Sequence, residues 1–162
     1  MIARQGYSAV QIGLHWLIVL LVLFQLVFGE SMAELFRAEL RAEPLPADAA
    51  LGEAHIWVGF AILAAVALRL VLRLVQGAPP PAEGSAFTRR LAAATHILFY
   101  VLLFAVPILG ILAYWWQPEL GEVHELSKPA FIVLIILHVA GALYHQFVKR
   151  DDVLMRMIRP AS

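Results

Sequence analysis

The chain has 162 residues, of which 62% are hydrophobic and only 15% charged, and its net charge is zero. Soluble domains use roughly 45–50% apolar residues, so lipid is the expected solvent for most of this surface, and nothing in the charge indicates a nucleic-acid partner. The absence of cysteine excludes disulfides, iron–sulfur clusters, thiolate-ligated haem and covalently attached haem. Any metal must therefore be bound by His, Met or carboxylate.

Four long apolar segments follow one another along the chain, and we expect helices at about 8–30, 54–75, 90–116 and 124–149. Each is long enough to cross a hydrocarbon layer of about 30 Å, and only helices close their own backbone hydrogen bonds in lipid. The first apolar run exceeds the usual length of a signal peptide, so we expect it to be retained. The pattern predicts an all-α integral membrane four-helix bundle, with residues 1–162 as one domain.

The distribution of charge predicts the orientation of the bundle. Nine of the twelve basic residues lie at the N-terminus, in the second connection and in the tail, whereas the first and third connections carry nine acids and only three basic residues. By the positive-inside rule, both termini are cytoplasmic. In the first connection, Ser31–Ala42 is expected to form a separate short helix at the outer surface, which Pro44 and Pro46 end.

Six histidines lie within or at the ends of the predicted spans, and histidine inside a membrane is costly enough that a functional role is the default interpretation. The alternative is hydrogen bonding between helices, worth only about 0.6–2 kcal/mol per contact. The six are His15, His55, His96, His124, His138 and His145.

Depth in the membrane sorts these histidines into pairs. His15 and His138 are each 11 residues from a basic residue at the inner surface, so they should lie at one level. His55 and His124 each begin a helix at the outer edge. A separation of 14 residues places His124 and His138 on one helix face about 21 Å apart. The expected pairs are therefore His15 with His138 and His55 with His124.

Each pair can bind a haem iron from its two faces, an arrangement suited to electron transfer. His145 lies about 10 Å beyond His138 and meets no partner on the first helix. A haem-free bundle whose histidines pair with one another is the remaining alternative.

Other residues carry two interpretations each. Gly59 and Gly141 allow the close approach of a porphyrin or of another helix. Arg69 and Arg73 either neutralise haem propionates or serve only as the basic residues that set the orientation of the chain at the inner surface. Pro107 is expected to kink the third helix.

His96 and His145 are the two histidines left once the other four are assigned as haem ligands. Near the inner surface they can donate protons to a quinone headgroup and orient it, or they can hydrogen-bond a haem propionate. Both interpretations stay open at this point.

Several stretches resemble the bacterial cytochrome b561 family, a group that includes superoxide oxidase, along nearly the whole chain. They are Leu14-His15-Trp16, His55 with Gly59, His124-Glu125, Leu137-His138, Ala142-Leu143-Tyr144-His145-Gln146-Phe147 and Lys149-Arg150-Asp151. The resemblance implies two haem b groups, the inner one on His15 and His138 and the outer one on His55 and His124. It also implies a ubiquinone site, for which His145 is the best candidate.

The implied function is that of an oxidoreductase of the bacterial inner membrane, which takes electrons from superoxide, or from another periplasmic donor, and passes them to ubiquinone. The alternative is a haem-bearing membrane anchor that passes electrons between a partner redox protein and the quinone pool. Acidic outer loops do not favour an anionic donor, unless Arg37, Arg41 and Lys128 form a local basic cluster.

Overall fold

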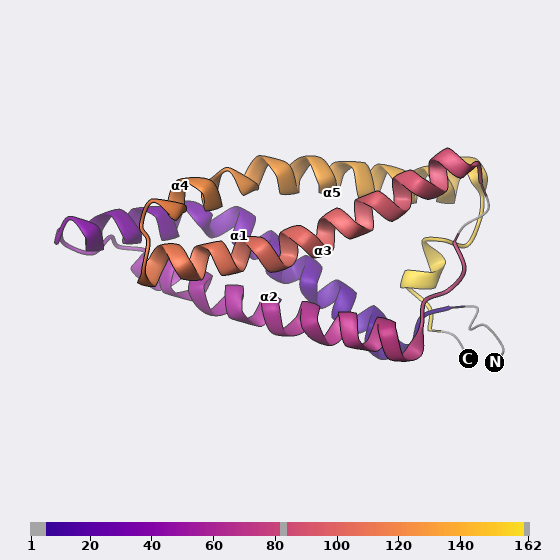
Figure 1. Cartoon of the computed structure of the whole chain (residues 1–162), viewed down its shortest axis with the longest axis horizontal. Coiled ribbons are helices and arrows are strands. Elements are labelled where there is room, and N and C mark those ends of the chain that lie inside the picture. Colours follow the sequence, from indigo (N-terminus) through magenta and orange to yellow (C-terminus); the bar gives the residue numbers. More distant parts are fainter. Residues whose placement is uncertain (1–5, 82–83, 161–162) are drawn as a thin grey trace.

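The computed structural model describes residues 6–81 and 84–160, and this part of the chain is helical without a strand. Four apolar helices are long enough to cross a membrane: Ala9–Leu40, Ala49–Gln76, Ala86–Trp115 and Leu120–Lys149. They confirm the predicted all-α membrane bundle (Figure 1). The elements are α1 (Ala9–Leu40), α2 (Ala49–Gln76), α3 (Ala86–Trp115), α4 (Leu120–Glu125), α5 (Ser127–Tyr144), the π-helix η1 (His145–Lys149) and the 3₁₀-helix η2 (Met155–Met157).

Two serines begin long helices because their side chains satisfy backbone N–H groups that lack a helical partner. The Ser8 hydroxyl accepts a hydrogen bond from the Gln11 N–H at 3.3 Å, and the Gln11 side chain accepts one from the Ser8 N–H at 3.1 Å. This is a capping box. The Ser85 hydroxyl caps α3 in the same way, accepting from the Thr88 N–H at 3.2 Å. Gly77 ends α2 with a φ of 80°, a conformation that glycine adopts without strain.

The separate surface helix expected at Ser31–Ala42 is not formed, because α1 continues through this segment to Leu40. The extension is held by packing: Leu35 is fully buried and lies against Gly52 near the start of α2. A Cβ at Gly52 would lie 2.8 Å from Leu35 Cδ2, closer than carbon atoms approach in a folded protein. A tertiary contact therefore keeps α1 helical beyond the length that a membrane requires.

The fourth span was expected to be one helix over residues 124–149, but it begins at Leu120 and is interrupted at Leu126, between α4 and α5. Pro129 explains the break, since it has no N–H for the Glu125 carbonyl and its ring clashes with that group. Proline is tolerated in the first turn of a helix, so α5 starts two residues before it. The last turn of the span is the π-helix η1, and Arg150 ends it with a φ of 54°.

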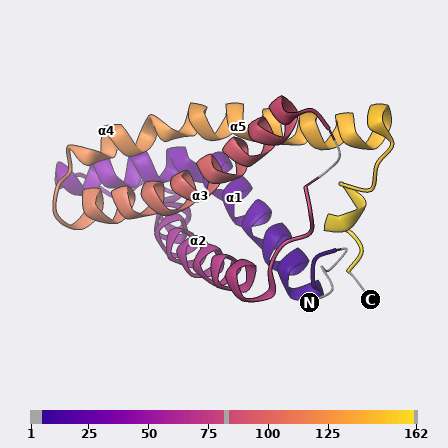
Figure 2. The ribbon, with the colours of Figure 1, turned by 45° about the vertical axis from the view of Figure 1, so that its right-hand side comes forward.

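The buried core is small and lies between α1, α2 and α5; it consists of Ile18, Val22, Ile62, Ala65, Val66 and Phe131. Most other apolar side chains are exposed, as expected for a surface in lipid. The first helix packs mainly on α2, whereas α3 packs on α2, α4 and α5. Figure 2 shows α1 and α2 diverging from α5 toward the end that holds the start of α1 and η2. We call this the termini end, and the opposite one the far end.

Candidate functional site

At the far end, a histidine of α2 faces a histidine of α4. The ring centroids of His55 and His124 are 6.0 Å apart and their planes cross at 71°. The structure thus brings together the two residues that were expected to pair at the outer edge of the membrane.

At the termini end, three histidines from three helices gather. His15 of α1 and His138 of α5 have ring centroids 6.3 Å apart, with planes crossing at 63°. His96 of α3 lies perpendicular to His138 at 5.4 Å, a contact that sequence reasoning missed. Its Nδ1 is 2.7 Å from the Ala92 carbonyl oxygen, and because a carbonyl only accepts, Nδ1 carries the proton. Nε2 of His96 is therefore the ring nitrogen left as an acceptor, and the residue itself is exposed.

The spacing within each pair can be compared with the spacing that a shared metal requires. A metal–imidazole bond is about 2 Å long and the ring centre lies about 1 Å behind the nitrogen, so two imidazoles on opposite faces of one iron have centroids about 6 Å apart. The observed values of 6.0 and 6.3 Å agree with this. In addition, Nδ1 of His55 is buried without a hydrogen-bond partner among the described residues, so the protein alone does not complete the surroundings of this ring. The residues present fit haem b.

The protein fixes His124 from α3. Its Nδ1 lies 2.9 Å from the Val106 carbonyl oxygen, so Nδ1 carries the proton and Nε2 is the nitrogen left with a lone pair for a metal. Gly110 makes room for the ring, because a Cβ there would lie 2.9 Å from His124 Cε1 and 3.1 Å from Nδ1. The sequence analysis identified neither Val106 nor Gly110. The only local signal for this contact was the position of Gly110 one helical turn after Pro107.

The two glycines that were expected near the cofactors differ in their surroundings. Gly59 faces α1, where a Cβ would lie 3.5 Å from Nε2 of Gln25, so it allows a helix contact. Gln25 in turn donates a hydrogen bond to the His55 carbonyl at 3.0 Å. Gly141 has no atom within 4 Å of a Cβ position, so no described protein group packs against it.

The two arginines expected near the inner propionates lie at the termini end. Arg69 is half-buried and donates to the Gln11 carbonyl at 2.5 Å, while Arg73 is exposed. Both line a small recess with Tyr7, Gln11 and Tyr100. The Arg69 guanidinium lies within electrostatic range of His15 and His138. An anionic group next to this histidine pair would therefore meet a partly buried positive charge.

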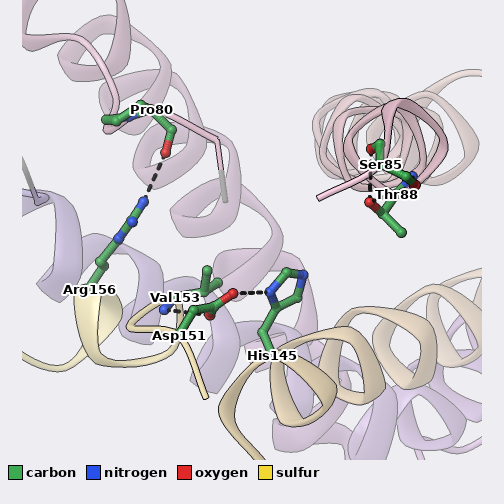
Figure 3. A network of polar contacts seen from close by, with 7 residues as sticks. All are labelled: Pro80, Ser85, Thr88, His145, Asp151, Val153 and Arg156. Atoms are coloured by element: carbon green, nitrogen blue, oxygen red, sulfur yellow. Dashed lines mark hydrogen bonds and ion pairs between the residues drawn. The ribbon is translucent and has the colours of Figure 1, made fainter. Parts of the chain in front are cut away.

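His145 lies apart from the two pairs, in the π-helix η1. Its Nδ1 is 2.6 Å from Asp151 Oδ2, and the Val153 N–H donates to Asp151 Oδ1 at 3.2 Å (Figure 3). Burial by itself would raise the pKa of Asp151, but the hydrogen bonds from His145 and Val153, together with electrostatic interaction with His145 and Arg156, hold that pKa below its usual value. π-Helical turns are frequent at functional sites.

The segment after η1 is attached to two other parts of the termini end. The Arg156 side chain donates to the Pro80 carbonyl at 2.8 Å (Figure 3), which fastens it to the connection between α2 and α3. Trp16, the neighbour of His15, donates from its indole N–H to the Met157 carbonyl at 2.8 Å. The tail therefore links η1 to α1.

Comparison with known proteins identifies the family of the chain. The family described as prokaryotic cytochrome b561 matches residues 6–160. The chain is 37% identical to cytochrome b562 of Cereibacter sphaeroides, over 99% of both chains. It is 28% identical to the probable superoxide oxidase CybB of Yersinia pestis, over 96% of this chain and 97% of that one, and 26% identical to cytochrome b561 homolog 2 of Escherichia coli, over 98% and 94%.

Four apolar helices and interior histidines define a multi-pass membrane protein of the electron-transfer class. The chain belongs to the prokaryotic cytochrome b561 family. Membership in this family implies that it binds haem b.

Proposed function

We propose that this chain binds two haem b groups and carries electrons across the bacterial inner membrane, from superoxide at the far end to ubiquinone at the termini end. The observation that supports this most directly is the presence of two facing histidine pairs, at 6.0 and 6.3 Å, toward opposite ends of one bundle. In this proposal the termini end is cytoplasmic, as the distribution of basic residues predicts, and residues 1–162 act as a single domain.

His55 and His124 would hold the outer haem, and His15 and His138 would hold the inner one. When bound, haem supplies reversible one-electron chemistry at iron; the protein supplies the ligands, their orientation and the surrounding field. The Val106 carbonyl holds the Nδ1 proton of His124 and so keeps Nε2 available.

Around the inner site, Arg69 provides positive charge for the haem propionates, with Arg73 at the rim of the same recess. We assign ubiquinone to His145, because its Nε2 remains for a ligand while Nδ1 is bonded to Asp151. His96, which lies against His138, belongs to the inner haem level rather than to the quinone site.

The haem proposal is tested by measuring haem per chain in the purified protein together with a reduced-minus-oxidised spectrum. We expect two haems per chain. One haem, or none, contradicts the arrangement of ligands in two levels.

The choice of donor is tested separately. The purified protein, with no partner, is supplied with enzymatically generated superoxide and a soluble ubiquinone, and quinol formation is measured with and without superoxide dismutase. Rapid quinol formation that dismutase abolishes supports superoxide as the donor; no quinol formation contradicts it.

The charge of the far end favours a second candidate, a membrane anchor that receives electrons from a partner redox protein. Arg37 and Arg41 line one surface recess together with Glu34 and Glu43, and Lys128 is not part of its lining. Arg37 is moreover 3.5 Å from a Glu30 carboxylate oxygen. Neighbouring carboxylates therefore offset the positive charge of the basic residues that would attract an anion. Acidic connections at this end suit a basic partner protein, which copurification under mild detergent conditions would reveal.

A further inference from the structure

The contact between His145 and Asp151 is placed where the proposed quinone reaction needs protons. Reduction of a ubiquinone headgroup to the quinol takes up two electrons and two protons. The electrons come from the donor of the proposed function, whereas the protons must enter from water at the same end of the bundle as the quinone. Asp151 lies two residues after Lys149, which ends the fourth span, and its side chain is 28% exposed.

The geometry fixes both oxygens of the carboxylate. Oδ2 is 2.6 Å from His145 Nδ1 and Oδ1 accepts from the Val153 N–H at 3.2 Å, so the carboxylate cannot turn away without losing two contacts. Figure 3 shows the carboxylate directed at the imidazole from the tail segment. A distance this short is typical of hydrogen bonds in which the partners are charged.

The backbone brings the two residues together across the end of the helix. The left-handed conformation of Arg150, with a φ of 54°, reverses the chain, and the Asp151 N–H then donates to the His145 carbonyl at 3.2 Å. The same two residues are thus joined by a backbone and by a side-chain hydrogen bond. The ring of His145, which is itself only 20% exposed, is held in one orientation.

We propose that Asp151 is a positioning residue for the quinone reaction: its carboxylate holds the Nδ1 proton of His145 and stabilises the doubly protonated ring, so that the Nε2–H is directed at a quinone carbonyl oxygen. This inference rests on the assignment of ubiquinone to His145. When the quinone takes up its two electrons from the donor, the Nε2 proton moves to one quinone oxygen, where an O–H bond forms as the N–H bond breaks. The second proton reaches the other quinone oxygen from water at the same end, and the ring regains its proton from that water. An imidazole with a proton on Nδ1 alone offers only a lone pair at Nε2. The step therefore uses the ring protonated at both nitrogens, whose positive charge would lie next to the Asp151 carboxylate.

The test uses four variants of the full-length haem-loaded protein in detergent: Asp151→Asn, Asp151→Glu, His145→Ala and the control Asp152→Asn. In the Asp151→Asn variant, an amide oxygen can still accept from Nδ1, so the orientation of the tail is kept while the charge is lost. Asp152 is a matched control because the charge change is the same and its side chain is exposed, with no side-chain hydrogen bond or ion pair seen in the described ranges.

Each protein is first reduced chemically, freed of reductant and mixed with a short-chain ubiquinone while haem reoxidation is followed, so that the identity of the biological donor does not matter. We expect unchanged haem content and spectra in all four variants. The rate at saturating quinone should fall by about a hundredfold or more in His145→Ala, where the proton donor itself is lost. It should fall less in Asp151→Asn, by about tenfold, because the imidazole remains. It should recover to within about threefold of wild type in Asp151→Glu, where a charged acceptor is restored, and stay unchanged in Asp152→Asn.

Three outcomes overturn the inference. Normal reoxidation in Asp151→Asn with slow reoxidation in His145→Ala refutes the role of Asp151 and leaves the quinone site in place. Normal reoxidation in both refutes the quinone site at His145 itself. Loss of haem in Asp151→Asn shows that the carboxylate has a structural role and refutes its role in positioning the proton donor.

Discussion

The tight contact between Gly110 and the ring of His124 makes Gly110→Ala a sensitive test of the outer haem site. The new Cβ would lie 2.9 Å from Cε1 and 3.1 Å from Nδ1 of the ring, whereas ordinary carbon contacts begin near 3.5 Å. The ring must therefore move by about half an ångström or more away from α3. That movement lengthens the hydrogen bond to the Val106 carbonyl, now 2.9 Å.

Losing a hydrogen bond of this kind costs about 0.5–1.5 kcal/mol, and disturbing the group that orients a metal-ligating histidine typically weakens metal binding by about 10–100-fold. We expect the outer haem to bind about tenfold more weakly. The inner haem should be retained, because the three atoms nearest to a Cβ at Gly110 all belong to His124 and none to His15 or His138. Haem per chain and reduced-minus-oxidised spectra of protein purified with limiting haem measure both effects.

Gly29→Ala is the matched control, since a Cβ at Gly29 would have no atom within 4 Å. It should keep both haems and gain a little helix stability. A Gly110→Ala protein with full outer-haem occupancy and an unchanged spectrum would refute the idea that α3 fixes the ring of His124.

Three further predictions concern other parts of the molecule. His15→Ala and His138→Ala should each remove the same haem and spare the other; spectra showing that they remove different ones would contradict the pairing. Gly52→Val should destabilise the bundle by at least about 1–3 kcal/mol through overpacking, because a Cβ there would lie 2.8 Å from a side-chain carbon of α1; thermal unfolding in detergent, with Gly29→Ala alongside, measures this. Because the pKa of Asp151 is lowered in the fold, its contacts stabilise the tail above the ordinary Asp pKa of about 3.9 and are lost as the pH falls through the lowered value. Hydrogen exchange of the Val153 amide should therefore lose protection on acidification, and an Asp151→Asn protein that lost it at the same pH would refute this.

The sequence predicted the four spans and the two histidine levels because both follow from simple periodic rules. Uninterrupted apolar runs fix the length of a span, and a rise of 1.5 Å per residue converts the position of His15 or His138 into depth. The assignment of these residues as haem ligands, and of His145 to ubiquinone, remains a prediction.

The contacts that orient the histidines could not be predicted in the same way. The bond from His124 to the Val106 carbonyl depends on how α3 is rotated against α4, and nothing in the local sequence sets that rotation. The continuation of α1 depends on Leu35 meeting Gly52 in another helix, and the closeness of Asp151 to His145 depends on a π-turn and one left-handed residue. Each is a consequence of tertiary packing rather than of local pattern.

The order in which the helices contribute histidines affects how the protein is assembled. His15 and His55 belong to the first two helices, while His138 and His124 belong to the last span, and α1 packs mainly on its neighbour α2. An iron held by either pair would join the two halves of the chain, so that folding draws on metal-binding free energy. In a cell starved of haem, newly inserted protein would join these halves only through protein packing, such as the small core that Phe131 shares with α1 and α2, and would be more exposed to membrane proteases until the cofactor arrives.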